Sequence, residues 1–190
     1  MDRTKSKENL DPRVMRTQSF ILDAFMALLK EKGFKFITVK EITERAGINR
    51  STFYAHYQDK FDLLNASLQA IFSAELERKA LNICQYSREE LCTLFTTVCR
   101  FVQNTSTNCK SVDSQFELIV EKQVRRQVQD LIEMWLGNIE GAKDLKPVAV
   151  AASWAIYGLA EQWSQDPNRE PLEVYADRVL PLVIAILPYA

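Results

Sequence analysis

Apolar residues recur every three or four positions along most of the 190-residue chain, which is the spacing of one face of an α-helix. Glycine and proline are scarce, and no run of alternating β-branched residues marks a strand. The pattern therefore predicts an all-α protein. We expect a flexible arm over residues 1–10, a three-helix head over 11–60 and a larger helical bundle over 61–190.

The first helix of the head is expected to begin at Pro12, because Asp11 is a good cap and proline suits the first helical turn. Its apolar residues form one stripe, and Gly33 is expected to end it. The connection that follows is rich in large apolar side chains. We expect them to fill the centre of the head, and they are Phe34, Phe36 and Ile37.

The clearest local signals follow this connection. Thr38 and Glu41 have the spacing of a capping box, which begins a helix. Gly47 can end that helix in a left-handed conformation, and Asn49 can cap the next one, which is expected to reach Tyr57. Two short helices joined by such a tight turn form a helix-turn-helix. This motif is the usual frame for placing one helix in the major groove of DNA.

Longer apolar stripes predict the helices of the body. A helix from Asp59 to about Asn82 would join the head to the body. Further helices are expected over 87–103, over 112–137 with a break, and from Pro147 and Pro171 onward, with loops at 104–108 and 138–146 and a kink at Pro181. The end of the last helix is apolar nearly all round. A partner subunit is its simplest cover, and an enclosed position in a monomer is the alternative.

The helix-turn-helix segment also carries a set of residues at characteristic spacings. Over residues 13–65 the sequence resembles the DNA-binding head of the TetR/AcrR family of bacterial transcriptional regulators. As a set of spaced positions the match is highly specific, although each element alone is weak. The matching residues are Ile21, Ala24, Leu28, Gly33, Thr38-Val39, Ile42, Ala46-Gly47-Ile48, Tyr54, His56-Tyr57, Lys60 and Leu63-Leu64.

The resemblance implies that double-stranded DNA is a partner. Lys60 has an additional argument, because a cation in the first turn of a helix is unfavourable for the helix dipole and would be better placed against a phosphate. Ala55 departs from the aromatic or polar residue of some members, which removes one contact. The implied phosphate-contacting or positioning residues are Thr38, Tyr54, His56 and Lys60, and those nearest the base edges are Arg50, Ser51 and Thr52.

The charges are divided unevenly along the chain. Residues 1–60 contain 12 Lys and Arg against 8 Asp and Glu, whereas residues 61–190 contain 12 against 17. A basic head on an acidic body is consistent with one end of the molecule facing phosphates. A chance imbalance is the alternative explanation of these counts.

The sequence offers little support for catalysis, a metal site or a cofactor. His56 is the only histidine, and there is no glycine-rich phosphate loop, nucleophile elbow or metal-ligand cluster. Cys84, Cys92, Cys99 and Cys109 lack a C-x-x-C spacing, so we expect reduced core cysteines, with a thiol sensor as the alternative. No signal peptide or membrane span is predicted. We therefore expect a cytoplasmic protein that is not an enzyme.

The body contains many large aromatic residues that could line a cavity or fill a core. The resemblance implies a small-molecule pocket inside the body, and the aromatic residues suit an apolar or aromatic effector. The segment WAIYGLAEQW looks like the dimerisation helix of the family. The expected pocket residues are Phe95, Cys99, Phe116 and Trp135, and the expected interface residues are Trp154, Gly158, Trp163, Val179 and Val183.

The leading hypothesis is a homodimeric transcriptional repressor that a small molecule releases from a near-palindromic DNA site. One alternative is a DNA-bound adaptor whose body binds a protein partner. Another is an enzyme that shares the helical fold. An activator is also compatible with the sequence, which does not encode the position of the DNA site.

Overall fold

The computed structural model of the chain describes residues 11–79, 86–108, 114–139 and 145–187. Within these ranges the chain forms eight α-helices and one short 3-10 helix, and no strand. This confirms the prediction of an all-α protein with a small head and a helical bundle. The predicted arm over residues 1–10 lies outside the described residues.

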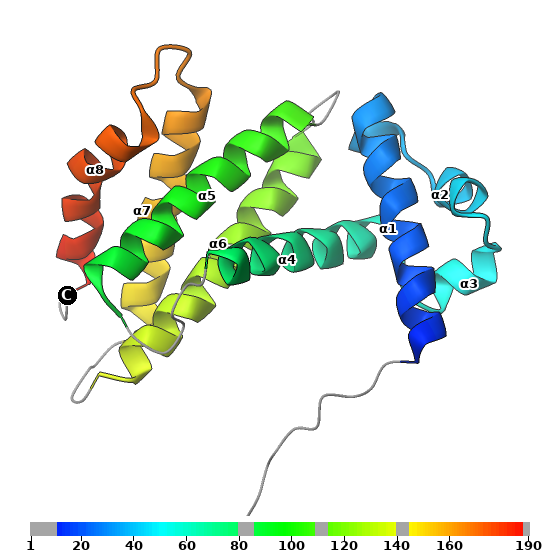
Figure 1. Cartoon of the computed structure of the whole chain (residues 1–190), viewed down its shortest axis with the longest axis horizontal. Coiled ribbons are helices and arrows are strands. Elements are labelled where there is room, and N and C mark those ends of the chain that lie inside the picture. Colours follow the sequence, from blue (N-terminus) through cyan, green and yellow to red (C-terminus); the bar gives the residue numbers. More distant parts are fainter. Residues whose placement is uncertain (1–10, 80–85, 109–113, 140–144, 188–190) are drawn as a thin grey trace, which may run out of the picture.

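The head consists of α1 (Pro12–Lys32), the 3-10 helix η1 (Phe34–Phe36), α2 (Val39–Ala46) and α3 (Arg50–Tyr54). Figure 1 shows α2 and α3 on the side of α1 that faces away from the body. As predicted, the Asp11 carboxylate accepts a hydrogen bond from the backbone N–H of Arg13, and Gly33 ends α1 with a φ of 80°.

Two of the three apolar residues in the connection after α1 are buried in the head as expected. Phe34 and Ile37 are buried, but 58% of the Phe36 side chain is exposed, so the prediction for Phe36 is wrong. The reason is the 3-10 turn, which has three residues per turn and points successive side chains in different directions. Three consecutive positions of such a turn cannot all face one core.

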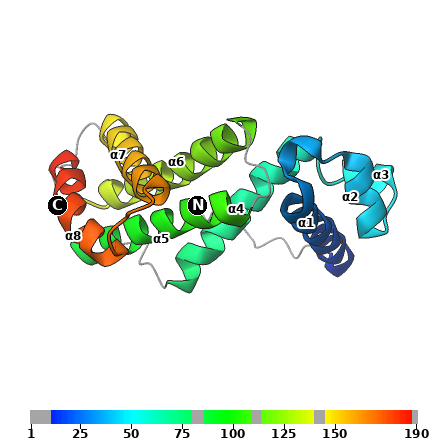
Figure 2. The same ribbon diagram turned by 90° about the horizontal axis from the view of Figure 1, so that it is seen from above.

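Helix α4 (Lys60–Arg78) runs from the head into the body, which is completed by α5 (Arg88–Asn108), α6 (Ser114–Gly137), α7 (Leu145–Gln165) and α8 (Leu172–Ile186). Figures 1 and 2 show α8 at the end of the molecule remote from the head. Helix α7 packs against both α5 and α6. Its buried face combines small residues with three large ones, and the full set is Ala149, Ala152, Ser153, Ile156, Tyr157, Ala160 and Trp163.

The predicted loop over residues 104–108 is wrong, because α5 continues to Asn108. The Thr105 hydroxyl donates to the carbonyl of Phe101 at 2.6 Å, and the Thr107 hydroxyl donates to the carbonyl of Gln103 at 3.0 Å. These polar side chains are therefore satisfied by the helix itself. Polarity alone did not mark a break in the helix.

Three other boundaries also differ from the predictions. Helix α6 is continuous over its described length, without the expected break. Helix α7 begins at Leu145, two residues before the proline that was expected to open it. Helix α4 ends at Arg78, and the predicted extension to Asn82 falls partly outside the described residues. None of these shifts changes which face of each helix is buried.

Candidate functional site

Helix α2 begins and ends as the sequence predicts. The backbone N–H of Glu41 donates to the Thr38 hydroxyl at 3.3 Å, and the backbone N–H of Thr38 donates to the Glu41 carboxylate at 3.0 Å. This is a complete capping box. Gly47 has a φ of 66°, which a residue with a Cβ adopts at a cost. The turn after α2 therefore depends on this glycine.

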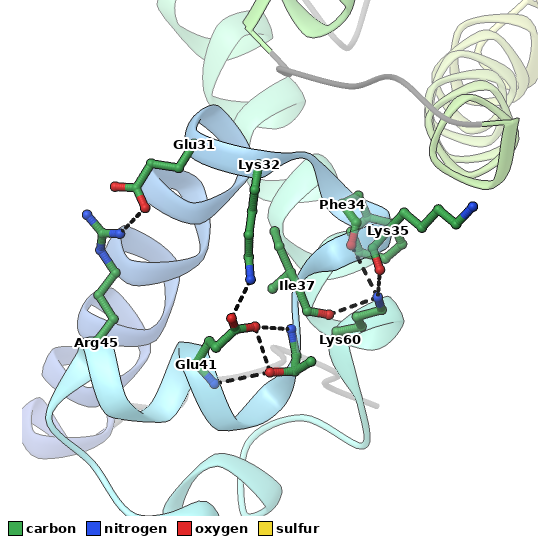
Figure 3. Close-up of polar contacts among 9 residues, drawn as sticks. Glu31, Lys32, Phe34, Lys35, Ile37, Glu41, Arg45 and Lys60 are labelled. Carbon is green, nitrogen blue, oxygen red and sulfur yellow. Dashed lines mark hydrogen bonds and ion pairs between the residues drawn. The ribbon is translucent and has the colours of Figure 1, made fainter.

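Two ion pairs fix α2 on α1, as Figure 3 shows. The Lys32 ammonium lies 2.5 Å from the Glu41 carboxylate, and the Arg45 guanidinium lies 2.6 Å from the Glu31 carboxylate. The hydrogen bonds from Lys32 and then Thr38 lower the pKa of Glu41 to about 2. The hydrogen bond from Arg45 likewise lowers the pKa of Glu31. Both carboxylates therefore stay ionised in mildly acidic solution.

Helix α3 is organised by Asn49 and Phe53. The Asn49 side-chain oxygen accepts hydrogen bonds from the Thr52 backbone N–H at 2.9 Å, the Thr52 hydroxyl at 2.8 Å and the Ser51 hydroxyl at 2.6 Å. Phe53 is fully buried and its ring meets the Tyr54 ring edge-on at 5.5 Å. The outer face of the helix is thereby held in one orientation.

The second helix of the motif is shorter than predicted. It ends at Tyr54 and the chain turns before Tyr57, although the backbone N–H groups of His56 and Tyr57 both still donate to the Phe53 carbonyl, at 2.9 and 3.0 Å. One carbonyl accepting two donors tightens the last turn. His56 and Tyr57 are therefore tied directly to the end of α3.

Helix α3 lies at the outer edge of the head (Figure 1) and carries four of the predicted DNA-contacting residues, while Thr38 precedes α2, His56 follows α3 and Lys60 begins α4. Thr38, Arg50, Ser51 and Tyr54 are exposed, with 57% of Tyr54 open to solvent. Thr52, His56 and Lys60 are half-buried. Helix α3 thus exposes a guanidinium, a hydroxyl and an aromatic ring, from Arg50, Ser51 and Tyr54. Contact of these residues with DNA stays a prediction.

Lys60 has a structural role that the sequence did not indicate. Its ammonium donates to the carbonyls of Phe34 at 3.1 Å, Lys35 at 3.2 Å and Ile37 at 2.9 Å (Figure 3), and lies 4.7 Å from the centre of the Phe34 ring. The carbonyls at the end of a helical turn carry partial negative charge. They compensate for a cation in the first turn of α4. The expected phosphate contact of Lys60 stays a prediction.

A cavity of about 310 Å³ lies between the head and the body. Its walls come from α1, α4, α5 and the start of α6. Of the four residues expected to form an effector pocket, Phe116 lines this cavity. The other three, Phe95, Cys99 and Trp135, are fully buried and are absent from its walls.

The described cysteines have the environment of core residues. Cys99 is fully buried, and burial raises the pKa of its thiol to about 12. Burial also raises the pKa of Cys92, which is half-buried. The nucleophilic form of cysteine is the thiolate, so these environments disfavour reaction at both sites. Cys84 and Cys109 lie outside the described residues.

The expected interface residues of α7 and α8 fall into two groups. Trp154 and Gly158 are exposed, whereas Trp163, Val179 and Val183 are buried within the subunit. The Trp163 indole N–H donates to the Glu170 carbonyl at 3.0 Å, which braces the turn between the two helices. The sequence analysis missed the other exposed apolar residues of this pair, which lie off the buried stripes: Val150, Val174 and Leu182.

None of the described helices combines the length and the apolar character needed to cross a membrane.

Sequence comparison matches the head to a known family. A family model described as "Bacterial regulatory proteins, tetR family" matches residues 21–67. The HTH-type transcriptional regulator YxbF of Bacillus subtilis is 41% identical over 69 residues, which cover 36% of this chain and 18% of YxbF. The chain thus spans less than a fifth of that relative.

Similarity outside the head is weaker but extends over most of the chain. The HTH-type transcriptional regulator AcrR of Shigella flexneri is 26% identical over 176 residues, covering 80% of both chains. The crystal structure of FadR from Bacillus subtilis, in complex with stearoyl-CoA, superposes with a TM-score of 0.57 at 16% identity, covering 88% of this chain and 97% of FadR. At this low sequence identity, the superposition shows only that the two chains share a fold. The family model and these relatives together identify the head, over residues 21–67, as a helix-turn-helix of the TetR/AcrR family of bacterial transcriptional regulators.

Proposed function

We propose that the protein is a homodimeric transcriptional repressor that binds a near-palindromic DNA site and is released from it by a small molecule. The observation that carries this proposal is the exposed face of α3, where Arg50, Ser51 and Tyr54 lie together at the outer edge of the head. A short exposed helix with hydrogen-bond donors and a cation suits the major groove.

In this proposal Arg50, Ser51 and Thr52 face the base edges, while Thr38, Tyr54, His56 and Lys60 contact or position phosphates. The hydroxyls of Ser51 and Thr52 both donate to Asn49, so their free lone pairs are acceptors. Acceptors in the major groove favour the amino groups of adenine or cytosine. Arg50 is suited to the acceptor edge of guanine. Phosphate contacts would supply most of the affinity and base contacts the preference.

The dimer is proposed to form through α7 and α8. Val150, Trp154 and Gly158 follow one another every four residues on α7 and are all exposed, and Val174 and Leu182 of α8 are exposed as well. An exposed apolar surface of this kind is typical of a protein interface. A two-fold dimer would place two copies of α3 in successive major grooves, with half-sites about 34–36 Å apart.

The position of α4, which joins the head to the body (Figure 2), supports the proposal that a ligand releases the protein from DNA. A ligand that binds better to a form with displaced heads would lower the affinity for DNA, and DNA would lower the affinity for that ligand by the same factor. FadR, which has a similar fold, was crystallised with stearoyl-CoA. A ligand site in the present chain is proposed by analogy with such complexes.

A gel shift tests the DNA-binding surface. The duplex is one recovered by selection from a random pool, and the variant is Arg50→Ala with Tyr54→Ala, because both side chains are exposed. We expect loss of specific binding. Arg126→Ala, an exposed position on α6, is the matched control and should bind as the unmodified protein does. Unchanged binding by the double variant would show that α3 is not the contact surface.

A DNA-bound adaptor is the second candidate, because the exposed apolar surface of α7 and α8 would also suit a protein partner of another kind. Analytical ultracentrifugation distinguishes the two candidates. A dimer at micromolar concentration that Gly158→Trp converts to a monomer supports the proposed homodimer. A monomer in the unmodified protein favours the adaptor.

A further inference from the structure

The cavity between the head and the body has an apolar interior. Helix α1 supplies Met26 and Leu29, and helix α4 supplies three aliphatic side chains. Two aromatic rings from α5 and α6 complete the walls. These five residues from α4, α5 and α6 are Leu64, Leu68, Ile71, Phe101 and Phe116. Such walls favour an apolar group of matching size.

The hydroxyl groups in these walls are already used by their own helices. Ser67 donates to the Leu63 carbonyl at 2.6 Å, and Thr97 donates to the Thr93 carbonyl at 2.7 Å. Thr105 donates to its own helix in the same way. Few hydrogen-bond donors therefore remain for a polar group deep in the cavity.

The rim of the cavity is positively charged. Lys30, Arg78, Lys79 and Arg100 lie there with a single carboxylate, that of Glu75. Arg78 pairs with Glu75 at 2.6 Å, and Arg100 pairs with Glu173 of α8 at 3.3 Å. Lys30 and Lys79 make no ion pair with any residue in the described ranges. The rim thus offers two ammonium groups to an anion.

From these features we infer that the cavity binds an amphipathic organic carboxylate, with its apolar part between α1, α4 and α5 and its carboxylate against Lys30 and Lys79. A water molecule occupies about 30 Å³ in the liquid, so 310 Å³ corresponds to a ligand of about ten heavy atoms. A medium-chain carboxylate has this size. The inference rests on the proposed function only for its regulatory consequence.

The regulatory consequence follows from Phe116, which lines the cavity and also packs against the head. Its ring centre lies 6.1 Å from that of Phe34, whose carbonyl accepts a hydrogen bond from Lys60 at the start of α4. The opposite wall of the cavity belongs to α1 of the head. A bound carboxylate therefore contacts both sides of the junction, and binding alters how the head sits on the body.

Isothermal titration calorimetry with decanoate tests the ligand class on the full chain. Decan-1-ol and decylammonium have the same apolar chain with no charge and with the opposite charge. We expect decanoate to bind, decan-1-ol to bind more weakly, decylammonium not to bind, and the decanoate affinity to fall with added salt. Equal affinity for decanoate and decan-1-ol, or no binding of decanoate, overturns the inference.

Variants locate the site. Lys30→Gln with Lys79→Gln should weaken decanoate binding about fivefold, because each exposed ion pair contributes little. Lys122→Gln with Lys146→Gln removes the same charge from exposed positions outside the cavity and should leave binding unchanged. Ile71→Trp, checked for folding by circular dichroism, should block binding by filling the cavity. An equal loss in both lysine pairs overturns the assignment of the site.

The gel shift, repeated with decanoate, separates this inference from the proposed function. Decanoate binding with the expected lysine dependence and a lowered affinity for DNA supports both. The same binding with unchanged DNA affinity leaves the carboxylate site in place and overturns its regulatory role. A protein that binds its duplex but no decanoate overturns the carboxylate site and leaves the DNA-binding function standing.

Discussion

In the head, polar side chains fix two helices, α2 and α3, that are too short to be stable alone, whereas in the body, long helices are fixed by buried apolar side chains. Helix α2 has eight residues and α3 has five, and each is capped by a side chain. Helices α5, α6 and α7 have 21 residues or more, and Trp135 near the end of α6 is fully buried.

The difference offers a physical reason why a family model matches the head, at residues 21–67. A cap, a left-handed glycine or an ion pair needs particular residue types at particular positions. Few sequences can therefore form the structure of the head. An apolar core tolerates many combinations that keep the volume and the pattern.

The substitution with the largest expected effect on stability lies in the apolar core of the body. Trp135→Ala should lower the free energy of unfolding by about 3–5 kcal/mol, because it removes a fully buried ring and leaves a cavity. Urea denaturation followed by circular dichroism measures it. Met134→Ala, the exposed neighbour on the same helix, should change stability by less than about 0.5 kcal/mol. Similar effects of the two substitutions would contradict the core that we describe.

The substitution with the next largest expected effect on stability removes the hydrogen bonds of one side chain in the head. Lys60→Met should destabilise the head by about 1–3 kcal/mol, because three carbonyls lose their common donor. Amide hydrogen exchange of residues in α1 and α2 measures the change without DNA. Lys35→Met, at an exposed position in η1, is the control. If Lys60 acts only on phosphates, Lys60→Met will weaken DNA binding and leave exchange in the free protein unchanged.

A smaller effect compares one glycine of each region. Gly47→Ala should cost about 1 kcal/mol, because its φ of 66° is unfavourable for alanine although no atom obstructs a Cβ. Gly137→Ala in α6 should be neutral or stabilising by up to about 1 kcal/mol, since a Cβ there also meets nothing. Thermal unfolding of both variants checks the sign. A neutral Gly47→Ala would show that the turn does not require the left-handed conformation.

The smallest effect is the pH dependence of the head. The pKa of Glu41 is lowered from 4.5 to about 2, so its ion pair and cap stabilise the folded state fully above about pH 4.5 and are lost as the pH falls toward 2. The contribution should be less than about 1 kcal/mol, because solvent screens this exposed pair. Glu41→Gln should flatten the acid limb of the stability profile, and Glu44→Gln, on the same helix, should not.

The sequence predicted those features of the head that are local. The capping box at Thr38 and Glu41, the left-handed Gly47 and the Asn49 cap are each defined within four residues, and all are confirmed. The clamp formed by Lys60 was not predicted, because its three partners lie 23 to 26 residues earlier in the chain. These contacts depend on the tertiary structure, which brings the start of α4 next to η1.

For the body, the apolar stripes predicted which helices form but not where a cavity remains. From the sequence, Phe95 and Trp135 were expected to line a pocket, yet both side chains are fully buried in the core. The cavity instead lies where α1 of the head meets α4 and α5. The position of the cavity depends on how the head packs against the body, and local sequence patterns do not predict this packing.

The central claim is that the exposed face of α3 selects a DNA sequence, and selection from a random duplex pool tests it most directly. The purified protein should enrich a near-palindromic sequence, and the variant Arg50→Ala with Tyr54→Ala should enrich none. Enrichment of the same sequence by both proteins, or no enrichment by the unmodified protein, would contradict the account.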